Sequence, residues 1–543
     1  MESGNTNAGE AAHACASCKK NKRRCDKNLP SCGSCIKTGR FCDYSDYAPS
    51  DHTDEINELR RRIEELEQCV LPVSTQTLYT PPGTQEPSHT PCTEASPSPE
   101  LSIQAYYLDS DLWSSCKFPD NAKRSIFAPE GISAVLGNQF EIDAMKTRYF
   151  ESVHIWMPIV SKIRLNRLVQ RAGGHVKADI ALLLLCMKLV QAVPHEQQTE
   201  PSELYIMAKQ FNSELELKGL LTLRMVQAGL LLSVYELGHG IFPAAFTTIS
   251  HCARQGVSLG IHNKSATQFL GESRSWVEWE ERQRVWWMVM ILDRYIIVGA
   301  GHRPLCTEDP SKDTILPADD GAWDSGEIVP PERVCLSSVT SSVSPFARLA
   351  QASNLLGRVI RHCNDTALEL EFVLDNYEML CQTIFSLVEL LSQDDSTASI
   401  ETSIAATICF SALLKLSDHH SCDLFNEGNQ YSEHNAASRI RECMQRSLQM
   451  SREICGRVVS FAQGLGQRLT QPAMQRISPL MLHCIYNCAA NLSWMSLETD
   501  NAQYVAGKLV CEDILGSISG RWKTAGVYLE LLRIGDMAQD ESC

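Results

Sequence analysis

The sequence has no uninterrupted hydrophobic run long enough to cross a bilayer, which needs about 20 apolar residues. The longest apolar stretch, IALLLLCMKLVQAV at Ile180–Val193, is interrupted by Lys188. A second stretch, WWMVMILDRYIIV, carries Asp293 and Arg294 in its middle. We expect both to be buried helices and predict no membrane partner. The first residues also lack an apolar signal-peptide region, so we expect the chain to stay inside the cell.

Several common signatures of enzyme active sites are missing as well. The sequence has no Walker loop, no His-Glu-x-x-His motif and no Gly-x-Gly-x-x-Gly turn. His419 and His420 in SDHHSC would point apart on a helix, so we interpret them as core or surface residues. Asp293 and Arg294 fit a structural ion pair better than a catalytic site. We therefore predict that the chain is not an enzyme.

Positive charge is scarce except near the N-terminus. The chain has 49 Lys and Arg against 65 Asp and Glu, a formal net charge of -16. Residues 11–45 reverse this balance, because they hold eight Lys or Arg and only two acids, Asp26 and Asp43, for a net charge of +6. A basic island on an acidic chain indicates a local site for a polyanion.

Cysteine is abundant and unevenly placed. Six of the 23 cysteines lie within the 28 residues CASCKKNKRRCDKNLPSCGSCIKTGRFC, in two copies of C-x2-C-x6-C. Clustered cysteines in a reducing compartment bind metal more often than they form disulfides. Zinc takes four ligands, so six thiolates satisfy two zinc ions only if two of them bridge. We predict two zinc ions as cofactors, with the ligands Cys15, Cys18, Cys25, Cys32, Cys35 and Cys42. The other 17 cysteines are interpreted as small core residues.

A basic run, KKNKRR, directly follows the second cysteine. As a short helix it would project Lys19, Lys22 and Arg23 along one side, toward a nucleic-acid groove and its phosphates. The predicted contacts with double-stranded DNA are Lys19, Lys20, Asn21, Lys22, Arg23 and Arg24. The alternative is a structural zinc module with a solvated basic face, or one that binds protein.

This stretch resembles the fungal binuclear zinc-cluster transcription factors. The cysteine spacing, the basic run and Pro30, two residues before the fourth cysteine, all match the family pattern. The resemblance implies that Cys15 and Cys32 are the bridging ligands. It also implies that Pro30 shapes the loop between the two halves and that Lys22 contacts a CGG triplet in the major groove. Asn21 stands where the family usually carries Arg or Lys, which leaves the half-site preference open.

A candidate dimerisation helix, EINELRRRIEELEQCVLP, follows a polar spacer at residues 43–53. Its apolar residues recur at alternating intervals of three and four, with β-branched residues at position a and Leu at d, which favours a parallel two-stranded coiled coil. We expect residues 54–71 to form a homodimer through Ile56, Leu59, Ile63, Leu66 and Val70. The alternative is an amphipathic helix packed on the large domain.

The next segment, residues 72–130, is expected to be a linker rich in Pro, Ser and Thr. Residues 72–100 contain seven Pro, four Ser and six Thr, a composition that cannot bury a core. QAYYLDSDLW within it is acidic and aromatic, which fits either an activation segment or docking onto the following domain. Residues 1–14 are expected to be disordered too.

Helical periodicity dominates from about Phe140 onward. Val285, Met288, Val289 and Leu292 fall on one helical face and are predicted to be core. Four segments are similar to the middle homology domain of the same family: YFESVHIWMPIVSK, CARQGVSLGIH, WEERQRVWWMVMILDRY and GHRPL. We therefore predict a mainly α protein with a zinc-cluster module at residues 15–42, a short coiled coil, a disordered linker, a helical middle homology domain at 140–330 and a C-terminal helical region at 331–543.

Together these features predict a nuclear, sequence-specific DNA-binding regulator of transcription. A homodimer would bind CGG-type half-sites, with the transcription machinery or co-regulators as further partners. The resemblance extends to pathway-specific activators, including regulators of secondary-metabolite gene clusters. The alternative function is a helical scaffold or ligand sensor whose zinc module binds protein.

Overall fold

The structure is a computed structural model that describes residues 14–39, 42, 99–115, 126–171, 175–193, 202–338, 343–365, 369–393, 400–421, 434–499 and 501–540. The chain divides into two compact units, Met1–Thr93 and Glu94–Cys543. The predicted coiled coil at residues 54–71 and the first part of the predicted linker lie outside the described residues.

The described residues of the first unit form two short helices, α1 (Ala16–Lys20) and α2 (Gly33–Thr38). Cys15 and Cys32 are the N-cap residues of these helices, so each copy of C-x2-C begins a helix. Gly39 ends α2 in the left-handed conformation, at φ 62°, which glycine adopts without a Cβ clash. The repeat in the sequence is therefore a structural repeat.

The second unit is built from helices, and the prediction of a mainly α protein is confirmed. Its described residues add two isolated β-bridges and two 3₁₀ turns, Val153–Ile155 and Pro479–Met481. The first helices are α4 (Pro99–Leu108), α5 (Ser110–Ser115), α6 (Glu130–Leu136), α7 (Gln139–Glu151), α8 (Lys162–Arg171), α9 (Ala178–Val190), α10 (Glu203–Leu217), α11 (Leu223–Gly238), α12 (Ala244–Leu259), α13 (Trp276–Tyr295) and α14 (Asp320–Ser325). The later helices are α15 (Pro345–Asn364), α16 (Leu370–Gln393), α17 (Ile400–Ser421), α18 (His434–Arg468), α19 (Gln471–Met474), α20 (Leu482–Glu498), α21 (Ala502–Ser519) and α22 (Lys523–Asp540).

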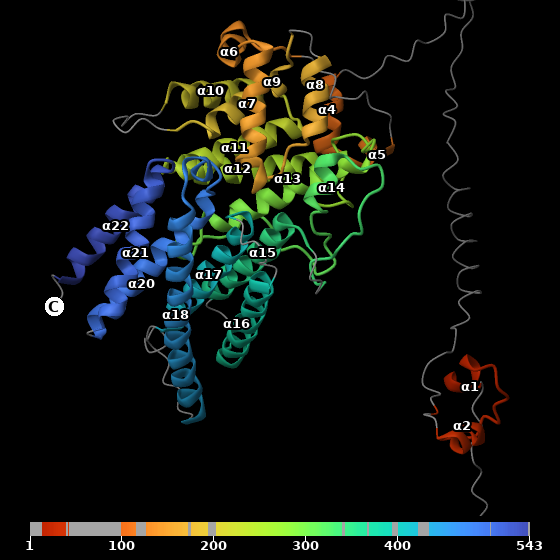
Figure 1. Ribbon diagram of the computed structural model, residues 1–543. Helices are drawn as coiled ribbons and strands as arrows, with labels where there is room; N and C mark the ends of the chain where they lie inside the picture. The colour runs from red at the N-terminus through yellow and green to blue at the C-terminus, as the bar shows by residue number, and fades with distance from the viewer. Residues whose placement is uncertain are drawn as a thin grey trace, which may run out of the picture. The chain divides into compact units, whose positions relative to one another are not determined.

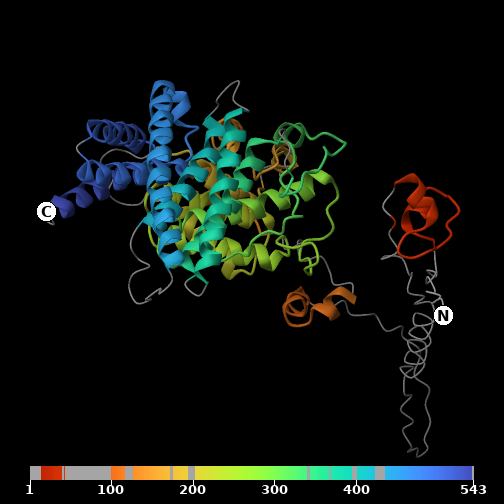
Figure 2. The ribbon, with the colours of Figure 1, turned by 90° about the horizontal axis from the view of Figure 1, so that it is seen from below.

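Most helices of this unit pack on helices close to them in the sequence. In the series α9, α11, α12, α13, α15, α17 and α18, each helix contacts the next one. The last three helices, α20, α21 and α22, form a bundle beside α18. The colour order in the ribbon follows the same path, from the yellow α10 through the green α13 to the blue α22 (Figure 1, Figure 2). Each helix therefore buries its apolar face on its neighbours.

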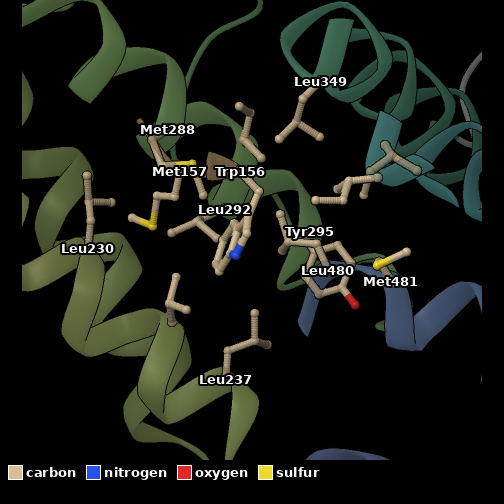
Figure 3. Close-up of a cluster of buried hydrophobic side chains, with 14 of the residues drawn as sticks. Trp156, Met157, Leu230, Leu237, Met288, Leu292, Tyr295, Leu349, Leu480 and Met481 are labelled. Atoms are coloured by element: carbon tan, nitrogen blue, oxygen red, sulfur yellow. The ribbon is translucent and has the colours of Figure 1, made fainter. Parts of the chain in front are cut away.

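One hydrophobic core joins the two regions that the sequence analysis placed at 140–330 and 331–543. In Figure 3, Met288 and Leu292 of α13 lie between Leu230 of α11 and Leu349 of α15, and Tyr295 lies beside Leu480 and Met481 of the Pro479–Met481 turn. The Tyr295 hydroxyl donates to the carbonyl of Pro479 at 2.9 Å. The predicted core stripe of α13 is confirmed, because its four residues are 0% exposed.

The C-terminal bundle also returns to α11. Trp522 is fully buried, and its indole N–H donates to the Ile477 carbonyl at 2.9 Å. A Cβ on Gly238, the last residue of α11, would lie only 2.1 Å from the Trp522 ring, so this position requires glycine. Close backbone approach thus fixes the end of α11 against the residues before α22.

Asp293 and Arg294 do not bond to each other but to the loop at residues 306–309. The Asp293 carboxylate accepts from the backbone N–H groups of Cys306 and Thr307 at 3.1 and 2.9 Å. Arg294 is 1% exposed and forms an ion pair with Asp309 at 3.0 Å. The expectation of a structural ion pair is correct for Arg294, but its partner is Asp309.

Residues 99–115, which fall inside the segment expected to be a linker, form α4 and α5. The Tyr106 hydroxyl donates to the carbonyls of Ser258 and Thr267 at 2.8 and 3.0 Å. The rings of Tyr106 and Trp113 pack against Phe269, with centroids 5.0 and 6.3 Å away. The acidic aromatic stretch therefore docks onto the large domain. None of the helices among the described residues is both long and apolar enough to cross a membrane.

Candidate metal centre

Four buried thiols come together in the first unit. The Sγ atoms of Cys15, Cys18, Cys32 and Cys35 all lie within 4.8 Å of one another, and each residue is at most 3% exposed. The Sγ–Sγ separations between the two halves are 3.7 Å for Cys15–Cys32 and Cys15–Cys35, 3.6 Å for Cys18–Cys32 and 4.0 Å for Cys18–Cys35. A disulfide needs about 2.05 Å, so these sulfurs are not bonded to one another.

The spacing of the four sulfurs matches zinc. Zinc–sulfur bonds are about 2.3 Å long, so two ligands at a tetrahedral angle lie about 3.8 Å apart. The four observed separations of 3.6 to 4.0 Å bracket that value. Sulfurs at this spacing can share a zinc ion, and zinc would supply the attraction that keeps four thiolates together.

The local fold aims the sulfurs at the centre. Cys15 and Cys32 accept from the backbone N–H groups of Cys18 and Cys35 at 3.5 and 3.4 Å, as capping residues do. C-x2-C thus places one sulfur at the N-cap and the other three residues later, on the same side of the helix start. The two helix starts face each other across the sulfur cluster.

The two remaining cysteines lie beside this group. Cys25 and Cys42 are partly buried and pack against the four thiols. The Cys42 sulfur accepts from the Cys32 backbone N–H at 3.2 Å. Cys25, Asp26 and Cys32 form a second set of ligand atoms within 4.8 Å of one another. Cys32 thus belongs to both sets, which is the position a bridging ligand would take.

Asp26 is a residue of this site that the sequence analysis did not select. Its two carboxylate oxygens accept from the Gly33 backbone N–H at 3.0 and 2.9 Å. This bond ties the loop after Cys25 to the start of α2. The Leu29–Pro30 peptide bond in the same loop is cis. The sequence signal for Asp26 was its place next to a ligand cysteine.

The thiols influence one another's protonation. Desolvation raises the pKa of the Cys15 thiol, and desolvation together with Cys32 raises the pKa of Cys35 to about 11. At Cys32, desolvation is outweighed by hydrogen bonds from the Cys35 backbone and side chain, and the pKa is lowered. Four thiolates at this spacing need a cation, so metal binding must release protons.

The basic run is arranged differently from the expected helix. Helix α1 ends at Lys20, and Lys22 has the positive φ of 48°. The expectation that one helix projects Lys19, Lys22 and Arg23 along one side is therefore wrong. The cause is the helix end inside the run, where Asn21 is the C-cap and Lys22 adopts a left-handed conformation. Lys19 ends up on the helix and Lys22, Arg23 and Arg24 on the turn after it, all exposed.

Asn21 has a structural role at this turn. It is the C-cap of α1, and its side-chain amide donates to the Ser17 carbonyl at 2.8 Å. The Lys20 side chain and the dimerisation residues Ile56, Leu59, Ile63, Leu66 and Val70 lie outside the described residues. The DNA contacts and the dimer stay predictions.

Two further clusters lie in the large domain. Cys455, Cys484, Cys488 and Cys511 meet in its core, and each is at most 1% exposed. His420, on α17, faces His362 of α15 with their Nε2 atoms 2.8 Å apart, and both rings are buried. Neither cluster has a signal in the sequence, because the four cysteines lie on the three helices α18, α20 and α21 and the two histidines on α15 and α17.

One hydrolase-like spacing, G-x-S-x-G, occurs in the sequence at Gly256–Gly260. A nucleophile elbow needs a sharp strand-to-helix turn that exposes the serine. Here the motif forms the end of α12, with Gly260 as its C-cap. Its geometry is that of a helix terminus, not of an elbow.

Comparison with known proteins identifies two domains. Residues 13–50 match the fungal Zn(2)-Cys(6) binuclear cluster domain, and residues 147–420 match the fungal specific transcription factor domain. The chain is 54% identical over 182 residues to the transcription factor BOA15 of Botryotinia fuckeliana, covering 34% of this chain and 99% of that protein.

Two more distant relatives share more of the chain. The pigment biosynthesis transcriptional activator pigB of Monascus ruber is 24% identical over 565 residues, covering 96% of this chain and 93% of that protein. The transcription factor AN6788 of Emericella nidulans is 24% identical over 407 residues, covering 64% and 62%. Both families and all three relatives are transcription factors, so the prediction that the chain is not an enzyme is confirmed. The chain belongs to the fungal-specific transcription factors with a Zn(2)-Cys(6) binuclear cluster domain.

Proposed function

We propose that the chain is a zinc-dependent, sequence-specific DNA-binding regulator of genes transcribed by RNA polymerase II. The observation that carries the proposal is the tetrahedral spacing of four thiols next to exposed Lys22, Arg23 and Arg24. Zinc would fix the two halves of the module, and the cations would then contact phosphates and base edges. The acidic remainder of the chain would disfavour nonspecific DNA binding.

Two zinc ions are proposed, with all six cysteines as ligands. Cys15 and Cys32 are proposed as the bridging pair, which is supported by the place of Cys32 in both sets of ligand atoms and by the 3.7 Å between the two sulfurs. The remaining ligands would be Cys18, Cys25, Cys35 and Cys42. Elemental analysis of purified protein tests the number directly, and well under two zinc ions per chain would contradict it.

DNA binding can be tested by gel shift with a CGG-containing duplex. The Lys22→Ala/Arg23→Ala variant should bind at least tenfold more weakly and show a salt dependence reduced by about two charges. Lys37→Ala is the matched control, because Lys37 is exposed on α2 outside the basic run. Binding that ignores a chelator, salt and the double variant would favour a zinc module that binds protein.

We further propose a homodimer through residues 54–71 that acts on two half-sites in the nucleus. Ile63→Asp/Leu66→Asp should give monomers in sedimentation and weaken paired half-sites far more than a single one. Arg61→Asp, at an outward heptad position, is the control. An unchanged dimer would place the interface elsewhere.

A role as activator of a biosynthetic gene cluster is proposed from the relatives. The Monascus ruber proteins pigB and mrl3 are named as activators of pigment and citrinin biosynthesis. Deleting the gene should then lower transcripts of a contiguous group of biosynthetic genes. Transcript profiles that change only at scattered loci would contradict this role.

A further inference from the structure

A cavity of about 700 Å³ opens in the large domain between α8, α9, α11 and α13. Its volume lies in the range of small-ligand pockets, about 300–1,000 Å³. The orange to green helices that border it occupy the upper part of the domain in Figure 1. Part of its wall is apolar, including Val160, Leu165, Leu168, Leu183, Leu223 and Phe269. None of the residues proposed to contact DNA lines this cavity.

Cations dominate the polar part of the wall. Seven lining residues are Arg or Lys and four are Asp or Glu, although the whole chain carries -16. Wall carboxylates neutralise three of the cations. The pairs are Arg224 with Asp179 at 2.7 Å, Arg164 with Glu278 at 3.0 Å and with Glu281, and Arg282 with Glu278 at 3.3 Å.

These ion pairs make a preformed wall. Glu281 is 6% exposed and accepts from the Ser161 backbone N–H at 2.8 Å and from the Gln227 amide at 3.1 Å. The Gln227 amide also donates to the Ile159 carbonyl at 2.6 Å. Because these wall residues bond to one another and to the backbone, the cavity does not need a ligand to keep its shape.

The other four cations are not paired in this way. Among the described residues, no carboxylate lies within ion-pair distance of the side chains of Arg167, Arg171, Lys177 and Arg274. All four are exposed at the rim, and Arg167 and Arg171 are one helical turn apart on α8. Against them stands one further lining acid, Glu272. The rim therefore has positive charge available for an anion.

We propose that this cavity binds a small amphiphilic anion, an apolar acyl or aryl body that ends in a carboxylate or a phosphate. The apolar wall would bury the body, which gains about 25 cal/mol per Å² removed from water. The head group would stay at the rim with Arg167 and Arg171, where charge-assisted hydrogen bonds are available. A neutral ligand would leave the rim cations unmatched, and a hydrophilic anion would leave the apolar wall wet.

Phe269 connects this cavity to the docked segment α4–α5. Phe269 lines the cavity and also packs against Tyr106 and stacks on Trp113. A ligand that touches Phe269 therefore changes the surroundings of Trp113. This contact gives the cavity a connection to the part of the chain that precedes the large domain.

Titration calorimetry of the full-length protein with sodium decanoate tests the proposal. We expect one saturable site, with 1-decanol and sodium acetate binding at least tenfold more weakly. Decyl phosphate, run in parallel, distinguishes the two head groups, and tighter binding of either one supports the proposal. Arg167→Ala/Arg171→Ala should weaken decanoate about tenfold and leave decanol unchanged.

Arg452→Ala is the matched control, because Arg452 is exposed on α18 and does not line the cavity. Leu168→Trp fills the apolar part and should abolish binding while the rim stays intact. The proposal is overturned if no saturable site is found for decanoate or decyl phosphate, or if the double arginine variant binds decanoate as tightly as the unmodified chain.

Discussion

The cysteine-rich module and the large helical domain bury different side chains. Among residues 14–39 and 42, the buried hydrophobic residues are Cys15, Cys18, Cys32 and Cys35, whereas the large domain buries a long series of Leu, Ile, Val, Met and aromatic residues. About 30 residues with so few apolar side chains cannot fold on hydrophobic burial alone. The module must therefore draw its stability from metal, and the large domain from its core.

Cysteine itself behaves differently in the two regions. The sulfurs of Cys15 and Cys32 accept hydrogen bonds from backbone N–H groups, which suits a thiolate. In the large domain, the sulfurs of Cys455 and Cys488 lie within hydrogen-bond distance of each other's carbonyl, at 4.0 and 3.6 Å, which suits a protonated thiol. Burial also raises the pKa of Cys409 to about 12. The hydrogen-bond partner thus separates ligand cysteines from core cysteines.

Removing zinc should produce the largest difference in stability between the module and the large domain. Structural zinc contributes about 10–16 kcal/mol in small domains, so a chelator should unfold the module completely. Hydrogen exchange followed by mass spectrometry should show loss of protection at Lys19 and Ile36, whose amides bond to Cys15 and Cys32. Protection of the large domain should not change, and it serves as the internal control. A module that stays protected without zinc would contradict the comparison.

Single cysteine substitutions should distinguish the zinc ligands of the module from the core cysteines of the large domain. Cys32→Ser removes a sulfur shared by both ligand sets, so zinc content should fall to one ion per chain or less and DNA binding at least 100-fold. Cys488→Ser is the matched change in the core, and it should lower the free energy of unfolding of the large domain by about 1–2 kcal/mol with unchanged zinc. Equal zinc contents in the two variants would refute the distinction.

Shortening a core side chain should destabilise the large domain and leave the zinc module unchanged. Leu230 is 0% exposed on α11, and Leu230→Ala should lower the free energy of unfolding of the large domain by about 3 kcal/mol. Leu217→Ala is the control, because Leu217 is 88% exposed at the end of α10. Zinc content should stay the same in both. Calorimetry checks the unfolding, and zinc loss in Leu230→Ala would show that the regions are coupled.

The sequence was sufficient wherever the signal is local. Spacing alone selected Cys15, Cys18, Cys32 and Cys35, and the period of 3.6 residues selected the core face of α13. It failed for the basic run, because α1 ends at its C-cap Asn21, before Lys22 and Arg23. It left the docking of α4 open as one of two alternatives, because Tyr106 bonds to a carbonyl about 150 residues away in the sequence.

The charged cavity could not be predicted from the sequence. Its lining comes from segments between Ile126 and Arg282, and no short motif contains more than a few of its residues. The buried pair His362–His420 is of the same kind, since its members are 58 residues apart. Such sites depend on how helices pack, which periodicity does not specify.

This histidine pair affects how the stability of the large domain depends on pH. Desolvation lowers the pKa of His362 to about 4 and of His420 to about 3. The unfolded chain then binds more protons than the folded one between pH 6.5 and 4, so the large domain loses stability as the pH falls through this range. Each histidine should contribute about 1–2 kcal/mol of this loss at pH 5.

Replacing both rings in His362→Gln/His420→Gln should therefore flatten the dependence of the unfolding free energy on pH, whatever the variant costs at pH 7. His251→Gln is the control with the opposite sign, because the hydrogen bond to Glu216 raises the pKa of His251. That pair stabilises the fold at low pH, so its loss should steepen the decline. Urea unfolding at pH 7, 6 and 5 measures both slopes. Equal slopes in the double variant and the unmodified chain would show that the pair is protonated without cost, and the module would then be the more acid-sensitive region through its thiolates.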